Sequence, residues 1–424
     1  MRGLSLLLLA VLGISTLGFA QTAGSAAMNW PMLKGQPSRV GSNPSETIIS
    51  KDNAKGLSLS WVGTMGDLVD FSSPAIVNGV VYIGSFDGKL YAFDANGCGQ
   101  STCSALWSGA TGNDITSSPA VASGVVYIGS ADHNLYAFPA NGCGQSECSP
   151  LWVGPTGKGV IDSSPVVAGG FVYVGSFNGK LYAFSASGCG QATCEALWTG
   201  TTGGAIESSP AVSNGTVYVG SNDGRLYAFS AQGCGKTNCQ PVWAGQTGGA
   251  IFESTPAVAN GVVYIGSSDT NLYAFNANGC GSRVCSPMWA GKTGGFIESS
   301  PAVANGVVYI GADDLFYAFN AAGCGSLRCS PIWHAEAVGA QAAIVSSPTV
   351  ANGLVYVGEN NGMVLVFDAD GCGMSFCHPL TQLLTENEQI VSSSPAVVNG
   401  TVYFGSANQD EAPIGRLYVF KLAQ

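Results

Sequence analysis

Four acidic residues recur at an almost constant spacing in the middle of the chain, each directly before a Ser-Ser-Pro or Ser-Thr-Pro tripeptide. They are Asp162, Glu207, Glu253 and Glu298. Like charges that converge raise one another's pKa unless a cation or water relieves them, and hard cations prefer oxygen ligands. We hypothesise that these carboxylates bind Ca²⁺ or a cationic ligand. The alternative is a solvated acidic rim that only aids solubility.

The 14 cysteines also follow a pattern, because they form seven pairs of the type Gly-Cys-Gly-x-x-x-Cys. A pair offers two thiolates, which is too few for a four-ligand zinc site, and redox-active pairs usually have the spacing Cys-x-x-Cys. We therefore predict seven local disulfides, typical of an oxidising compartment. The predicted bridges are Cys98–Cys103, Cys143–Cys148, Cys189–Cys194, Cys234–Cys239, Cys280–Cys285, Cys324–Cys329 and Cys372–Cys377.

Motifs for other chemistry are missing from the sequence. It contains no Gly-x-Ser-x-Gly, no His-Glu-x-x-His and no phosphate-binding P-loop. The three histidines, His133, His334 and His378, stand at unequal places in the pattern and are expected at the surface or in turns. The net charge of −11 excludes a nucleic-acid partner, which would need a basic face. No catalytic residue is predicted.

The elements that carry these residues repeat along the chain. The proline of the Ser-Ser/Thr-Pro tripeptide returns every 45 to 47 residues. Each copy continues with an Asn-Gly or related turn, an apolar run such as Val-Val-Tyr-Ile-Gly, and a second run such as Leu-Tyr-Ala-Phe. The eight prolines are Pro74, Pro119, Pro165, Pro210, Pro256, Pro301, Pro348 and Pro395. A period of this length, with turn signals and no helical periodicity, indicates a repeat architecture.

Each copy is expected to form four short antiparallel strands, so the fold class is all-β: an eight-bladed propeller. A solenoid is the alternative. Proline suits the start of an edge strand, which places Ser-Ser-Pro-Ala-Val innermost and the Leu-Trp strand outermost. The last copy lacks an outer strand, and Leu57–Trp61 stands unattached before the first copy. We predict that this N-terminal strand closes the ring, and that removing residues 21–63 leaves an aggregation-prone product.

The N-terminal sequence predicts that the protein is exported and indicates where its segments begin and end. Met1-Arg2, an apolar run from Leu4 to Leu12 and small residues ending at Ala20 are typical of a secretory signal peptide. We expect a signal at 1–20, a non-repeating segment at 21–56 and the propeller at 57–424. The mature protein is expected in the periplasm or outside the cell, as a monomer without a membrane span.

The repeats resemble a known family. The phrase Leu90-Tyr91-Ala92-Phe93-Asp94-Ala95-Asn96-Gly97, leading to Leu106-Trp107, is similar to the pyrroloquinoline quinone (PQQ) repeat, over residues 57–421. The resemblance implies an eight-bladed propeller of either of two kinds, quinone-dependent dehydrogenases or non-enzymatic scaffolds. The adjacent Cys-Cys pair of the dehydrogenases is absent, and the mature chain has only five arginines for a tricarboxylate cofactor.

These differences favour an exported, non-catalytic binding or scaffold protein that recognises a protein, peptide or glycan partner through one face of the ring. No cofactor is expected other than the Ca²⁺ hypothesised at the four carboxylates. The alternative is a PQQ- and Ca²⁺-dependent periplasmic dehydrogenase.

Overall fold

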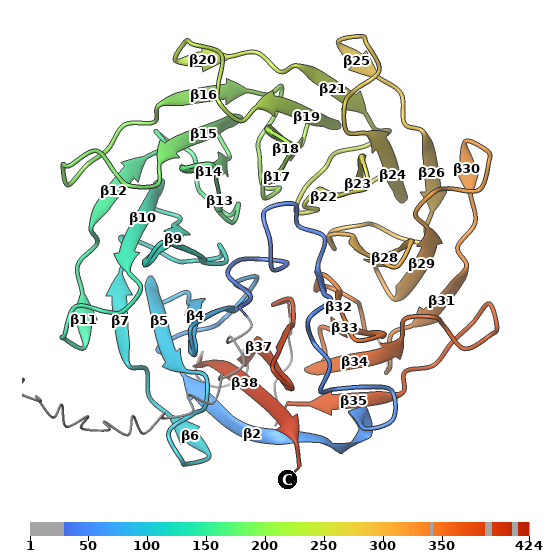
Figure 1. The fold of residues 1–424 in the computed structure, drawn as a ribbon, viewed down its shortest axis with the longest axis horizontal. Coiled ribbons are helices and arrows are strands. Elements are labelled where there is room, and N and C mark those ends of the chain that lie inside the picture. Colours follow the sequence, from blue (N-terminus) through green and yellow to red (C-terminus); the bar gives the residue numbers. More distant parts are fainter. Residues whose placement is uncertain (1–28, 340–341, 386–391, 409–413, 424) are drawn as a thin grey trace, which may run out of the picture.

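The eight repeats form eight small sheets arranged as blades around a common axis, so the predicted all-β propeller is confirmed (Figure 1). The computed structural model describes residues 29–339, 342–385, 392–408 and 414–423. The predicted signal peptide, 1–20, lies outside the described residues. Within them, no helix has the length and hydrophobicity that a membrane crossing requires.

The innermost strand of each blade begins directly after the proline of the tripeptide, as predicted. Proline lacks a backbone N–H and therefore fits where a strand starts at a sheet edge. The side chains that follow are small, mostly alanine and valine, because eight of these strands meet around the narrow axis. The inner strands are β3 (Ala75–Val77), β8 (Ala120–Ala122), β13 (Val166–Ala168), β17 (Ala211–Ser213), β22 (Ala257–Ala259), β27 (Ala302–Ala304), β32 (Thr349–Ala351) and β36 (Ala396–Val398).

The second strand follows a tight turn in which Asn78 and Gly79 both have positive φ, as an Asn-Gly hairpin turn requires. Its residues are buried on both faces, because each blade packs between two neighbours. The second strands are β4 (Val80–Gly84), β9 (Val125–Gly129), β14 (Phe171–Ser176), β18 (Thr216–Ser221), β23 (Val262–Ser267), β28 (Val307–Ala312), β33 (Leu354–Gly358) and β37 (Thr401–Asn408).

The third strand carries the Leu-Tyr-Ala-Phe motif, whose leucine, alanine and phenylalanine are fully buried in the first blade. It pairs antiparallel with the second strand on one side and with the outer strand on the other. The third strands are β5 (Lys89–Asp94), β10 (Asn134–Pro139), β15 (Lys180–Ser185), β19 (Arg225–Ser230), β24 (Asn271–Asn276), β29 (Leu315–Asn320), β34 (Met363–Asp368) and β38 (Ile414–Leu422).

The outer strand of the eighth blade comes from the N-terminal side of the chain, as predicted. β2 (Leu57–Thr64) pairs antiparallel with β38, so the two ends of the repeat array meet in one sheet and close the ring. The other outer strands are β7 (Trp107–Ala110), β12 (Trp152–Pro155), β16 (Trp198–Thr201), β21 (Trp243–Gln246), β26 (Trp289–Lys292), β31 (Trp333–Glu336) and β35 (Thr381–Leu384).

The seven disulfide loops also pair with the neighbouring blade. All 14 cysteines are paired as predicted. In five blades the second cysteine ends a two-residue strand that pairs in parallel with the outer strand of the preceding blade, and two further loops make the same contact as single bridges. The short strands are β6 (Thr102–Cys103), β11 (Glu147–Cys148), β20 (Asn238–Cys239), β25 (Val284–Cys285) and β30 (Arg328–Cys329). We call these seven loops the clasps.

Close packing against the preceding blade explains why the first residue of each Gly-Cys-Gly motif is glycine. Gly142 has a φ of 72°, and a Cβ there would lie 2.8 Å from the ring of Trp107 in the preceding blade. The glycine therefore allows both a left-handed turn and close packing on the tryptophan. Each clasp covers an exposed sheet edge, which would otherwise be free to pair with another chain.

The N-terminal segment fills the centre of the ring, which the sequence did not predict. The dark blue trace enters the axis in Figure 1 and contacts the inner strands in turn. Backbone N–H groups of these strands donate to its carbonyls, for example Val121 to Pro31 and Val212 to Pro37, both at 2.7 Å. Prolines suit these positions because only their carbonyls are used. The segment ends in β1 (Ser42–Asn43), parallel to β32, and a short 3₁₀ turn, η1 (Ala54–Gly56), leads into β2.

Two buried cations fix this plug, which we define as residues 29–43. The Arg39 guanidinium, fully buried, donates to the carbonyls of Leu33, Ser164, Pro165 and Pro210 at 2.7 to 3.1 Å. Burial lowers the pKa of Arg39 to about 9, so it stays charged at neutral pH.

Lys34 is the second cation, and its Nζ donates to the Ser300 carbonyl at 3.1 Å. Burial, with a smaller contribution from the charge of Arg39, lowers the pKa of Lys34. The plug therefore replaces solvent at the axis with the chain's own polar groups.

Candidate functional site

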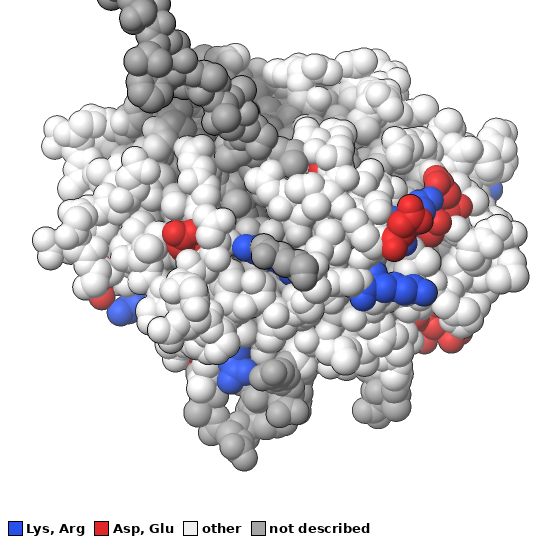
Figure 2. All heavy atoms as spheres, turned by 60° about the horizontal axis from the view of Figure 1, so that its bottom comes forward, with Lys and Arg blue, Asp and Glu red and all other residues white. Residues whose placement is uncertain are grey.

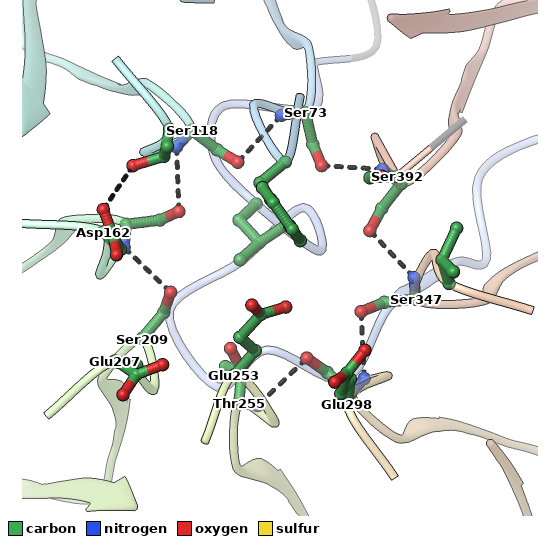
Figure 3. A pocket seen from close by; sticks show the side chains of 17 residues that line it. Ser73, Ser118, Asp162, Glu207, Ser209, Glu253, Thr255, Glu298, Ser347 and Ser392 are labelled. Atoms are coloured by element: carbon green, nitrogen blue, oxygen red, sulfur yellow. Dashed lines mark hydrogen bonds between the residues drawn. The ribbon is translucent and has the colours of Figure 1, made fainter. Parts of the chain in front are cut away.

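The Ser-Ser-Pro tripeptide builds the rim of one mouth of the channel. The first serine acts within its blade: the Ser72 hydroxyl accepts from the Gly84 N–H at 2.9 Å, and all eight blades repeat this bond. The second serine acts between blades, because its hydroxyl accepts the N–H of the corresponding residue in the preceding blade. Seven such junctions follow one another around the ring, including Ser394 to Ser73, which joins its two ends (Figure 3).

The four predicted carboxylates lie directly above this ring of hydroxyls, at the same mouth. Asp162, Glu207, Glu253 and Glu298 line one cavity of about 110 Å³. Leu33 of the plug lines it too, so the plug closes the channel below the acidic residues. The remaining blades contribute Phe71, Thr116, Val345 and Ser392 at the equivalent places, as the repeat alignment indicates. We call the cavity the acidic mouth.

Glu253 is the carboxylate of the mouth whose pKa is most raised by its surroundings. Its side chain points into the mouth in Figure 3. Burial raises the pKa of Glu253 to about 8, and the charges of Glu298 and Glu207 add to the shift, followed by those of Asp70 and Asp162. At neutral pH this group holds a proton that a cation in the mouth would displace.

Asp162 and Glu207 are held by neighbouring side chains instead. The Thr116 hydroxyl donates to Asp162 at 2.6 Å, and burial is the main reason that the pKa of Asp162 is raised. The Asn222 amide donates to Glu207. These bonds fix two carboxylates on one side of the mouth and leave Glu253 to face the centre.

Asp70 belongs to the same electrostatic cluster and was missed in the sequence. Its position is one residue before the alignment place, which Phe71 occupies with a φ of 62°. Burial raises the pKa of Asp70, while a hydrogen bond from Ser392 lowers it. A fifth carboxylate therefore acts on Glu253 from the start of the first blade. The strict repeat register concealed it, because the signal lies in a neighbouring position.

The turns between the second and third strands stand on this same face. Asp132 accepts from the Tyr136 hydroxyl at 2.5 Å and from the Gly112 N–H at 2.9 Å. The equivalent Asp223 and Asp269 accept from Tyr227 and Tyr273 in the same way. These carboxylates are structural, because their hydrogen bonds hold the loops around the mouth. The three histidines do not line the mouth.

A metal ion and a quinone make different demands on this site. The carboxylate oxygens are the donor type that Ca²⁺ prefers, yet within the described ranges no three His, Cys, Asp or Glu side chains are grouped so that they could hold a metal ion. The calcium site therefore stays a prediction. A tricarboxylate quinone does not fit, because the described residues that line the mouth include four carboxylates and no lysine, arginine or histidine.

Comparison with known proteins gives the family and a fold shared by two functional classes. The family model described as outer membrane protein assembly factor BamB matches residues 50–189, 145–283 and 238–423. No curated protein sequence matches.

Three solved structures illustrate the likeness in fold. BamB from Moraxella catarrhalis is 18% identical, with a TM-score of 0.63, and the match covers 86% of this chain and 97% of that one. Quinohemoprotein alcohol dehydrogenase from Comamonas testosteroni is 15% identical, with a TM-score of 0.69 and coverage of 94% and 81%. A europium-containing methanol dehydrogenase is 12% identical, with a TM-score of 0.68 and coverage of 93% and 98%.

Proposed function

The chain belongs to the family of the outer membrane protein assembly factor BamB, and from this premise we propose that it is an exported, non-catalytic binding protein. In this proposal it recognises a protein, peptide or glycan partner through the face of the ring that carries the acidic mouth. The observation that carries the proposal is the plug. Because residues 29–43 fill the axis, contact with a partner is left to the loops and the shallow mouth above Leu33.

The competing function is that of a quinone-dependent dehydrogenase, which the fold also supports. Such an enzyme needs a site for an anionic cofactor. The two cations nearest the axis, Lys34 and Arg39, are fully buried and donate to backbone carbonyls. They are therefore engaged between the plug and the inner strands, and the groups that line the mouth would repel a tricarboxylate.

The chemistry of the mouth favours a positively charged group of the partner. A lysine or arginine side chain, or Ca²⁺, would lower the pKa of Glu253 and relieve its repulsion with Glu298 and Glu207. The hydroxyls around the rim already accept backbone N–H groups, so they are fixed in position before a ligand arrives. A rigid acidic pocket of this kind is pre-organised for a cationic group.

Isothermal titration calorimetry of the full chain tests this proposal with a tetralysine peptide and, separately, with Ca²⁺. Binding of the peptide is expected at low salt, with proton release near pH 7 and weakening as salt is added. The triple variant E207Q/E253Q/E298Q should lose at least tenfold in affinity. E195Q, which alters an exposed glutamate directly after the Cys189–Cys194 clasp, should not. Equal affinity of the wild type and the triple variant would overturn the proposal.

A further inference from the structure

One outer edge of the ring lacks the cover that the others have. Clasps pair with β2, β7, β16, β21 and β26 as short strands and with β12 and β31 as bridges. Among the described residues, β35 of the seventh blade is the one outer strand without such a partner. The reason lies in the sequence, because the eighth blade has no Gly-Cys-Gly-x-x-x-Cys loop to supply it.

The seam between the seventh and eighth blades differs in two further ways. Thr381 stands where the other outer strands have tryptophan, so the ring that a clasp glycine would contact is absent. The Tyr356 hydroxyl is buried and finds no hydrogen-bond partner in the described part of the chain, whereas the equivalent Tyr309 donates to the Ala369 carbonyl of the next blade at 2.7 Å.

The apolar part of this seam is nevertheless filled. Ile49 and Ala54, from the segment between the plug and β2, are fully buried there and pack in one cluster with Leu383 and Phe420. Lys51 of the same segment forms ion pairs with Asp368 and Asp370. What remains uncovered is therefore the hydrogen-bonding edge of β35 and not a hydrophobic core.

The register shows which groups of β35 face outward. Gln382 pairs with Leu365 as Ser108 pairs with Tyr91. In the first blade, the Ser108 N–H points away from its own sheet and donates to the Ser146 carbonyl of the clasp at 2.9 Å. By the same geometry, the Gln382 N–H and carbonyl point outward. The side chain of Gln382 is exposed, and that of Leu384 is 59% exposed.

We propose that β35 accepts an extended segment of a partner protein as a parallel fifth strand, in the way that the clasps cover the other seven outer edges. This surface is separate from the acidic mouth and goes beyond the proposed function. Strand addition of this type takes affinity from main-chain hydrogen bonds and specificity from alternate side chains.

The clasps define the chemistry of the segment. Their first paired residue is exposed and varies, with threonine, glutamate, asparagine, valine and arginine among the examples, while the second is always a buried cysteine. The partner segment thus has an unrestricted residue opposite Gln382 and a small side chain opposite Leu383. A clasp from a second copy cannot serve, because each of the seven clasps is already paired with an outer strand of its own ring.

Charge on this side of the ring is sparse. Figure 2 turns the lower edge of Figure 1 toward the reader, and most of the described surface there is uncharged, apart from single charged residues and one group of neighbouring acidic and basic side chains. The segment is therefore uncharged or weakly basic, in keeping with a chain of net charge −11.

The probe that tests this is a fluorescent, oxidised octapeptide with the sequence of Cys280–Pro287, a copy of one of the protein's own clasps. Fluorescence anisotropy with the full chain should show saturable binding. Hydrogen exchange of the fragment that contains β35 should slow at least tenfold at the Gln382 amide. Binding should disappear in Q382P, which removes the outward N–H, and with a probe N-methylated at the second cysteine, which removes the probe's own donor.

Two comparisons make the result decisive. S108P removes an N–H that a clasp already uses and should lower the melting temperature, whereas Q382P should leave it unchanged. E253Q should bind the probe like the wild type, because the acidic mouth is not involved. The proposal is overturned if the probe fails to bind at millimolar concentration or if Q382P destabilises as much as S108P. Protection of β35 that rises with protein concentration would also overturn it, since the occupant would then be a second copy.

Discussion

Replacing Arg39 with methionine tests the plug most sharply, because the change keeps an unbranched side chain that covers the inner part of the space and removes the charge and all its donors. Four backbone carbonyls would lose their hydrogen-bond donor at once, one in the plug and three in the segments that lead into the inner strands β13 and β17. A hydrogen bond to a charged group contributes about 1.5 to 3 kcal/mol, and a buried cation costs several kcal/mol to desolvate. The net loss in the free energy of unfolding should be about 3 to 5 kcal/mol.

The assay is urea unfolding followed by tryptophan fluorescence, with a thermal scan in parallel. The melting temperature should fall by roughly 4 to 6 °C, because the unfolding entropy of a chain of this length is about 0.8 kcal/mol/K. R225M is the matched control, because Arg225 lies on the third strand of the fourth blade and donates to the exposed Gln246 side chain; it should change stability by less than about 0.5 kcal/mol. If R39M lies within about 1 kcal/mol of the wild type, the plug does not stabilise the ring through this residue.

Three further predictions follow from single contacts. Glu253 has a folded-state pKa of about 8 against 4.5 for the free group. The protonated carboxyl therefore contributes to the free energy of unfolding at low pH, and this contribution is lost as the pH rises. Between about pH 5 and pH 8 the wild type should lose up to about 3 kcal/mol relative to E253Q, measured by urea unfolding at each pH. The double variant C143S/C148S should lose about 2 kcal/mol, from the closure entropy of a loop of about six residues, and an unchanged melting temperature would contradict this. Y309F loses a hydrogen bond and should cost about 1 kcal/mol, whereas Y356F removes a buried hydroxyl without a partner and should be neutral or stabilising; a larger loss for Y356F would show that its hydroxyl is paired.

The sequence predicted the ring because every blade repeats the same local signals. Proline at the inner edge, the Asn-Gly turn and the Leu-Trp strand each act over a few residues, so their spacing alone gave the strand order and the closure by β2. The position of the four carboxylates followed from the same repeat, since equal register places them at one mouth.

Features that occur once could not be predicted in this way. Arg39 is one of many polar residues in residues 21–56, and its role depends on carbonyls more than a hundred positions away. Asp70 escaped because it lies one residue before the aligned position, which Phe71 occupies. The clasps were expected to close only on themselves, because pairing between blades is set by the curvature of the ring, which no single repeat encodes.

The most direct test of the acidic mouth as a binding surface, and not a quinone pocket, is retention of PQQ by the full chain. The protein is incubated with PQQ and Ca²⁺, passed through gel filtration, and examined for quinone absorbance and dye-linked alcohol or glucose oxidation. The lining of the mouth predicts no retained quinone and no turnover above a blank. Stoichiometric quinone absorbance with activity that E253Q abolishes would contradict the proposed function and assign the chain to the dehydrogenases.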